Sequence, residues 1–166
     1  MRVLVSAASK HGATEGIVEA IAETLAEAGI EPVVLEPSAV VSLEGIDAAV
    51  IGSGIYAGRW LGPAKDLLGR HAGELRRRPV WLFSSGPLGD PPFPGGEPAD
   101  GETMREFVGA REDRVFAGRL ERDDLGVGER LMARVVHAPA GDFRPWPEIR
   151  SWAAGIAEQL LSGVPA

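Results

Sequence analysis

The sequence predicts one α/β domain with a parallel central sheet, and three observations carry this prediction. Short apolar runs alternate along the 166 residues with segments whose apolar residues recur at helical spacing. The run Ala48–Gly52 is uninterrupted, as is typical of a parallel strand that is covered on both faces. Several runs end in loops rich in glycine and serine. These features favour a three-layer sandwich, with five parallel strands in the order 2-1-3-4-5 and helices on both faces.

Strands and helices are expected to alternate through the first half of the chain. The predicted strands cover residues 3–5, 32–35, 48–52 and 79–83, and the predicted helices cover 15–28 and 62–75. Gly29 is a natural end for the first helix, and Pro63 lies in the first turn of the second. This alternation requires right-handed crossovers between parallel strands.

The second half is expected to be less regular. Proline and glycine crowd residues 91–100, which predicts an excursion over the surface. A short helix is expected over 103–109, a fifth strand over 114–120 at a sheet edge, and a last helix from 147. The segment at about 121–146 is interpreted as an insert of this one domain (1–166), with an amphipathic helix over 126–137 and an irregular stretch over 138–147. Trp81 and Trp152 are expected in the core.

Composition limits the function classes. With no cysteine, the chain has no disulfide, no thiolate nucleophile and no cysteine-ligated metal, and no other metal site is expected. A net charge of -7 weighs against nucleic-acid binding. No leader pattern is present, and no apolar run reaches the roughly 18 residues of a membrane span. We therefore expect a soluble, cytoplasmic protein that binds no nucleic acid.

The loop after the first strand has the features of an anion site. The backbone N–H groups and the macrodipole of the following helix would point at a phosphate, and hydroxyl groups, a lysine and a flexible glycine add to them. The predicted phosphate-loop residues are Ser9, Lys10, His11, Gly12, Ala13 and Thr14. The alternative is a capped turn without a ligand. A lone loop histidine is usually solvated, so His11 receives no catalytic role.

Two further loops are expected to converge on the same point, because they follow neighbouring strands of a sheet whose order reverses there. Tyr56 and Trp60 offer aromatic rings for stacking, and the alternative for Trp60 is packing beneath the neighbouring loop. The predicted second-loop residues are Ser53, Gly54, Tyr56, Ala57 and Trp60, and those of the third loop are Ser85, Gly86, Pro87, Gly89 and Asp90. Together the three loops predict a flat, phosphorylated, heteroaromatic ligand.

These loops resemble those of flavodoxin-like proteins, in particular the flavodoxin-domain group that includes the bacterial quinone-dependent protoporphyrinogen dehydrogenases. The resemblance covers essentially the whole chain and implies FMN as the cofactor, with the phosphate on the Ser9–Thr14 loop. Two positions depart from the family pattern, which often has an aromatic residue at Ala7 and a hydroxyl or amide side chain at Ala13. A somewhat weaker phosphate affinity is therefore expected.

The insert suggests which molecules exchange electrons with the flavin. The run Glu129–Arg134 is similar to the insert of the porphyrinogen-oxidising members, which implies an oxidoreductase of haem biosynthesis that passes electrons from a porphyrinogen to a quinone. Arg130 and Arg134 would then hold substrate propionates or rest on anionic lipid at the inner face of the cell membrane. The alternatives are an FMN electron carrier that docks on redox partners, a flavin-free regulatory protein, and arginines that are merely solvated. The catalytic residues, the electron donor, the electron acceptor and the oligomeric state stay open.

Overall fold

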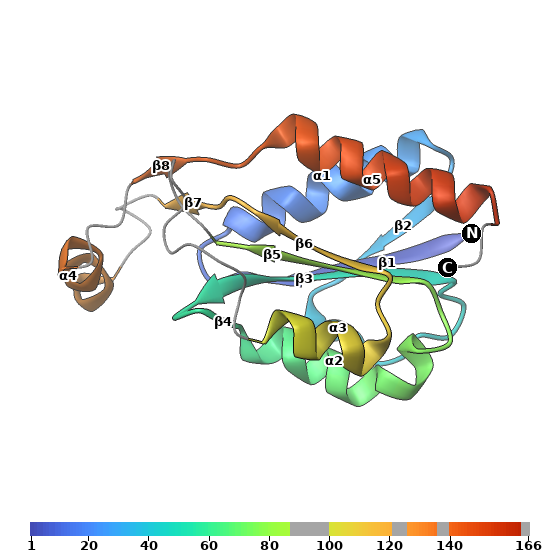
Figure 1. Cartoon of the computed structure of the whole chain (residues 1–166), viewed down its shortest axis with the longest axis horizontal. Coiled ribbons are helices and arrows are strands. Elements are labelled where there is room, and N and C mark those ends of the chain that lie inside the picture. Colours follow the sequence, from blue (N-terminus) through green and yellow to red (C-terminus); the bar gives the residue numbers. More distant parts are fainter. Residues whose placement is uncertain (87–99, 121–125, 136–139, 164–166) are drawn as a thin grey trace.

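The computed structural model describes residues 1–86, 100–120, 126–135 and 140–163, and within them the chain forms a three-layer sandwich (Figure 1). A mostly parallel sheet lies between two layers of helices. Helices α1 (Ala13–Glu27) and α5 (Trp146–Leu161) cover one face, and helices α2 (Gly62–Leu75) and α3 (Gly101–Val108) cover the other. The predicted fold class is confirmed.

The five parallel strands have the predicted order. They are β1 (Arg2–Ala8), β2 (Glu31–Val34), β3 (Ala48–Tyr56), β5 (Val80–Ser85) and β6 (Glu112–Phe116). Their order across the sheet is β2-β1-β3-β5-β6, which is 2-1-3-4-5 when these five strands are counted along the chain. A short additional strand, β4 (Arg59–Trp60), pairs antiparallel with β3. The sequence order therefore reverses between β1 and β3, which fixes the switch point of the sheet.

Alternation along the strands divides the core into two clusters. Val3 and Val5 of β1, with Trp81 of β5, pack towards α1 and α5, while Leu4 and Leu82 pack towards α2. Such strands are apolar on both faces, which is the property that identifies them in the sequence.

Both tryptophans expected in the core are buried there. Trp81 is 0% exposed and Trp152 is 6% exposed, and both belong to the cluster beneath α1 and α5. The Trp152 ring meets Phe116 edge-to-face at 5.5 Å between centroids. Its indole N–H donates to Glu112 Oε2 at 3.1 Å. The predicted core positions of these two residues are confirmed.

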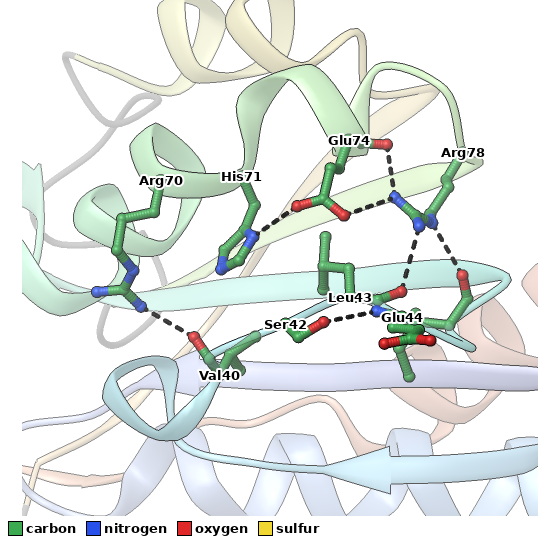
Figure 2. Close-up of polar contacts among 9 residues, drawn as sticks. Val40, Ser42, Leu43, Glu44, Arg70, His71, Glu74 and Arg78 are labelled. Atoms are coloured by element: carbon green, nitrogen blue, oxygen red, sulfur yellow. Dashed lines mark hydrogen bonds and ion pairs between the residues drawn. The ribbon is translucent and has the colours of Figure 1, made fainter.

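Arginine side chains secure the irregular segment that leads into β3. This segment follows the 3₁₀ helix η1 (Pro37–Ala39) and has few strand partners for its carbonyl groups. Arg70 of α2 donates to the Val40 carbonyl at 3.3 Å, and Arg78 donates to the Leu43 carbonyl at 3.2 Å (Figure 2). These contacts hold the sheet layer and the α2 layer together at the end of α2.

Two predicted elements differ from the structure. β3 continues past Gly52 to Tyr56 and returns through a tight turn in which Ala57 and Gly58 have φ values of 49° and 73°, so part of the predicted second loop is a β-hairpin. The predicted fifth strand over 114–120 is wrong as one element. β6 ends at Phe116, and Arg119–Leu120 forms a separate strand, β7.

A two-stranded ribbon joins the start and the end of the insert predicted at about 121–146. β7 pairs antiparallel with β8 (Gly141–Asp142), which lies in a stretch expected to be irregular. Helix α4 (Val127–Val135) lies between these strands in the sequence and beyond the end of the sheet in space (Figure 1). Within the described ranges, no helix combines the length and apolar character of a membrane span. The surface excursion predicted over 91–100 falls outside the described residues except for Asp100.

Candidate functional site

A cleft with a volume of about 150 Å³ lies at the carboxyl ends of β1, β3 and β5. This is the switch point of the sheet, where open α/β folds bind their ligands. The predicted residues that line it are Ser9, Lys10, His11, Ala13, Thr14, Gly54, Tyr56, Ser85 and Gly86. The structure thus brings together residues of all three predicted loops. It adds Ile55, Leu61, Gly118, Arg119 and Leu120, which the sequence interpretation missed.

The first loop leaves hydrogen-bond donors available at the start of α1. Gly12 is the N-cap residue with φ of 74°, a left-handed conformation that favours glycine, and within the described part of the chain no side-chain hydrogen bond caps the helix. Ser9 Oγ is buried and has no hydrogen-bond partner among the described residues. Thr14, in the first turn, is 3% exposed. A buried hydroxyl without a partner beside uncapped N–H groups fits an anion such as a phosphate.

Charged and aromatic side chains meet over this loop. Lys10 Nζ lies 3.7 Å from the centroid of the Tyr56 ring, a cation–π arrangement, and also pairs with Glu129 of α4. Glu129 Oε1 is 3.6 Å from His11 Nε2. The hydrogen bond from Lys10 lowers the pKa of Glu129, and the same bond raises the pKa of Lys10. The insert therefore touches the first loop through a carboxylate that the sequence did not single out as a site residue.

The second loop divides between the cleft and the core. Tyr56 is 50% exposed at the cleft, so its ring is available for stacking. Trp60 is 3% exposed, belongs to the core cluster beside α2, and donates from its indole N–H to Ser84 Oγ at 2.8 Å. The expected flavin contact of Trp60 is corrected here, because the hairpin turns this ring inward, which is the alternative of packing beneath a loop.

Two other second-loop candidates do not line the cleft. Ser53 is buried, and its hydroxyl accepts from the Leu61 N–H at 2.9 Å and donates to the Gly54 carbonyl at 2.8 Å. Ser53 therefore shapes the wall of the cleft through the backbone. Ala57 lies in the turn between β3 and β4, where its positive φ serves the hairpin.

The third loop begins with a close approach of backbones. A Cβ at Gly86 would lie 2.7 Å from Ile55 Cβ, and a Cβ at Gly118 would lie 3.3 Å from Gly86 Cα. Glycine is thus required sterically where this loop, β3 and the end of β6 meet. Pro87, Gly89 and Asp90 lie outside the described residues, so their predicted contacts stay predictions.

The β7–β8 ribbon brings two arginines to the first loop. Arg119 Nη2 donates to the His11 carbonyl at 3.4 Å, and Arg144 Nη1 donates to the Ala13 carbonyl at 3.2 Å. The sequence signal for Arg119 was its place near the end of the predicted fifth strand (114–120), where the arginines were interpreted only as the sign of a sheet edge. Arg130 is exposed on α4 and is not among the described residues that line the cleft. Arg134 belongs to α4, but its side chain lies outside the description.

Comparison with protein families decides the classification. The family model described as a flavodoxin domain matches residues 4–144, which include the first loop, the cleft and the ribbon. The chain belongs to the flavodoxin-domain family. FMN is the cofactor of flavodoxin domains, so the cofactor predicted from the loops is confirmed at the level of the family.

Solved structures similar to this flavodoxin-domain protein include flavodoxins and part of a larger oxidoreductase. A flavodoxin from the domain Archaea has a TM-score of 0.67 at 16% identity, covering 97% of this chain and 99% of that one. The two-electron reduced flavodoxin of Megasphaera elsdenii has a TM-score of 0.63 at 16% identity, with coverage of 95% and 99%.

The rubredoxin oxygen:oxidoreductase of Desulfovibrio gigas has a TM-score of 0.67 at 14% identity. The match covers 99% of this chain but only 37% of that enzyme. No curated protein sequence matches the chain. At these identities the structural likeness establishes the flavodoxin fold, and the chemistry of this flavodoxin-domain protein has to be argued from its own cleft.

Proposed function

We propose that this protein binds FMN in the cleft and acts as an FMN-dependent oxidoreductase. The observation that carries the proposal is the first loop, where the N–H groups at the start of α1 and the Ser9 hydroxyl, which has no partner among the described residues, would form an anion site at the switch point. The bound isoalloxazine would supply the redox chemistry. The first loop would bind the phosphate, and Tyr56 would stack on the ring system.

The size of the cleft supports a ligand that extends beyond it. Sites for small molecules usually enclose roughly 300–1,000 Å³. The cleft measures about 150 Å³, so the described residues enclose part of such a site. The third-loop residues Pro87, Gly89 and Asp90 would complete it beside the ring, as their sequence resemblance implies.

We further propose a porphyrinogen as the electron donor and a quinone as the acceptor. Helix α4, which carries the Glu129–Arg134 run, reaches the first loop through Glu129. Val127 and Leu131 of this helix are 87% and 63% exposed, and Arg130 is also exposed. Apolar side chains beside a cation suit a macrocycle that bears carboxylates, or an anionic lipid surface from which a quinone is reached.

An electron carrier without its own organic substrate is the second candidate. The net charge of -7 favours it, because an acidic surface steers association with basic redox partners. The archaeal and Megasphaera flavodoxins, which the chain covers over 99% of their lengths, also support it.

Flavin binding and turnover separate these candidates. The protein should quench FMN fluorescence on titration, and the FMN-loaded protein should oxidise a porphyrinogen when a quinone is supplied. Arg130→Glu with Arg134→Glu should preserve FMN binding but impair turnover or association with anionic liposomes. The matched control is Arg114→Glu with Arg150→Glu, which makes the same charge change at exposed residues of β6 and α5.

Each outcome has a definite meaning. Absence of FMN binding would refute the flavin proposal. FMN binding without porphyrinogen turnover, together with electron transfer to a redox protein, would establish the carrier candidate instead. Equal losses in the two double variants would show that overall charge, rather than the α4 surface, determines the activity.

A further inference from the structure

We propose that Arg119 is the residue that selects the phosphorylated flavin, by placing its guanidinium against the phosphate at the first loop. This inference rests on the proposed FMN binding and goes beyond it, because it assigns discrimination between FMN and riboflavin to a residue of β7, outside the three predicted loops. None of the three loops predicted from the sequence contains this residue, which was expected to lie in the fifth strand over 114–120.

Arg119 lies where a phosphate would bind. It lines the cleft, and its Nη2 donates to the His11 carbonyl at 3.4 Å. A Cβ at Gly12 would lie 4.0 Å from the same nitrogen, so the guanidinium sits against the N-cap residue of α1. The positive end of the α1 macrodipole and the guanidinium therefore converge on one place.

The ribbon holds Arg119 in this position. Arg119 of β7 is paired in register with Asp142 of β8. Asp142 is held by Arg144, whose Nε and Nη2 donate to its two carboxylate oxygens at 2.8 and 2.6 Å, and these bonds lower the pKa of Asp142. The positive charge of Arg119 also contributes to the lowered pKa of Asp142, so this carboxylate faces both arginines. The partner of Arg119 in the ribbon is fixed independently of any ligand.

Arg144 ties the ribbon to α1 at a second point. Its side chain is only 10% exposed, donates to the Ala13 carbonyl at 3.2 Å, and lies 4.4 Å from the centroid of the Trp146 ring. A Cβ at Gly16 would come within 2.7 Å of Arg144 Nη1, so α1 provides a glycine where this guanidinium passes. Such preorganisation spares the entropy of ordering a long side chain when the ligand binds.

The other cation of the site is less suited to this role. Lys10 is paired with Glu129, whose carboxylate would repel a phosphate, and its ammonium lies over the Tyr56 ring. Ala13 has no polar side chain to donate. A guanidinium presents a planar pair of donors that matches phosphate oxygens, whereas an ammonium acts as a point charge.

The test compares FMN with riboflavin, which lacks the phosphate. Dissociation constants of both flavins are measured by fluorescence quenching at low and high salt for the wild type, Arg119→Gln, Arg119→Lys and the control Arg114→Gln. Arg119→Gln should weaken FMN by about 10- to 100-fold, because a hydrogen bond to a charged group is lost. Its riboflavin affinity should stay within about twofold, and its salt dependence for FMN should be shallower than that of the wild type.

The conservative variant Arg119→Lys and the control Arg114→Gln separate a loss of charge at the site from a general effect. Arg119→Lys keeps the charge and should recover part of the FMN affinity, while Arg114→Gln on β6 should leave both flavins unchanged. The proposal is overturned if Arg119→Gln keeps its FMN affinity, or if it loses FMN and riboflavin equally, since equal loss indicates a general structural role. Failure of the wild type to bind FMN would instead refute the proposed function, and this inference with it.

Discussion

Replacing Thr14 by valine tests whether the first loop binds the phosphate of a flavin. Thr14 is the second residue of α1, is 3% exposed and lines the cleft, so its hydroxyl belongs to the first turn with the uncapped N–H groups. Valine keeps the shape and the branched Cβ but removes the hydroxyl. The expected effect on the protein is therefore confined to the polar contact with the ligand.

The structure sets the size of this effect. A hydrogen bond to a charged group contributes about 1.5–3 kcal/mol. At 1.4 kcal/mol for each factor of ten, Thr14→Val should raise the dissociation constant of FMN roughly 10- to 150-fold. A Cβ at Gly54 would lie 3.1 Å from Thr14 Oγ1, so β3 packs closely against this hydroxyl. This close packing leaves little room for a water molecule to take the place of the hydroxyl in the valine variant.

Calorimetric titration with FMN measures the effect, and a second threonine of the same helix gives the control. Thr24 Oγ1 donates to the Ala20 carbonyl at 2.8 Å and does not line the cleft, so Thr24→Val should leave FMN affinity unchanged. Thr14→Ser, which keeps a hydroxyl, should bind nearly as tightly as the wild type. If Thr14→Val binds FMN within twofold of the wild type, Thr14 does not contact the phosphate and the proposed geometry of the loop is wrong.

Three further variants have defined outcomes. Glu129→Gln should tighten FMN binding at neutral pH, because it removes a carboxylate that is paired with Lys10 beside the phosphate site. Since the pKa of Glu129 is lowered, its ion pair with Lys10 persists below the ordinary titration range of a carboxyl and is lost only as the pH falls through the lowered pKa. Below that pKa the variant and the wild type should bind FMN alike. Gly52→Ala should lower the free energy of unfolding by about 1–3 kcal/mol in denaturant titration, because its Cβ would lie 2.3 Å from the Phe83 ring. Trp60→Phe should cost about 1–3 kcal/mol of stability through its lost buried hydrogen bond, with no change in the absorption spectrum of bound FMN.

Controls and contrary results are equally defined for these variants. Gly69→Ala on α2 has nothing within 4 Å of its new Cβ and should stabilise the protein by up to about 1 kcal/mol, the difference in helix propensity. A Gly52→Ala variant as stable as Gly69→Ala would contradict the close packing of β3 on β5. A changed flavin spectrum in Trp60→Phe would restore this ring as a flavin contact, and weaker FMN binding by Glu129→Gln would mean that the carboxylate supports the site.

The sheet and the cleft were predictable because their signals are local. Uninterrupted apolar strands such as Val80–Phe83 reveal burial on both faces, and glycine-rich loops after successive strands reveal which edge binds the ligand. The hairpin after β3 was missed because this strand continues through Ser53 and Gly54, which look like loop residues in the sequence. In the structure, Ser53 of β3 pairs with Ala8 of β1, and this pairing extends β3 beyond Gly52. Without the hairpin, the inward direction of Trp60 had no sequence signal.

The charged residues of the insert were harder to predict, because their partners are distant in the sequence. Glu129 is separated from Lys10 by 119 positions, and Arg119 is separated from His11 by 108. Helical spacing on α4 drew attention to Arg130 and Arg134 instead, since periodicity identifies a face but not what that face meets. The break of the fifth strand before Arg119 depends on the close approach of Gly118 to Gly86, which only the assembled sheet creates.

Two sets of contacts join this region to the first loop and α1. The ribbon makes one set through Arg144, and helix α4 makes the other through Glu129. The ribbon is tied to α1 by the Arg144 side chain, which is 10% exposed and also binds Asp142, and these contacts involve no ligand. Helix α4 meets the first loop through the exposed pair of Lys10 and Glu129, and exposed ion pairs stabilise little. A phosphate at the first loop would compete with Glu129 for the same lysine. Flavin binding would therefore weaken this contact of α4 while leaving the contacts of the ribbon in place.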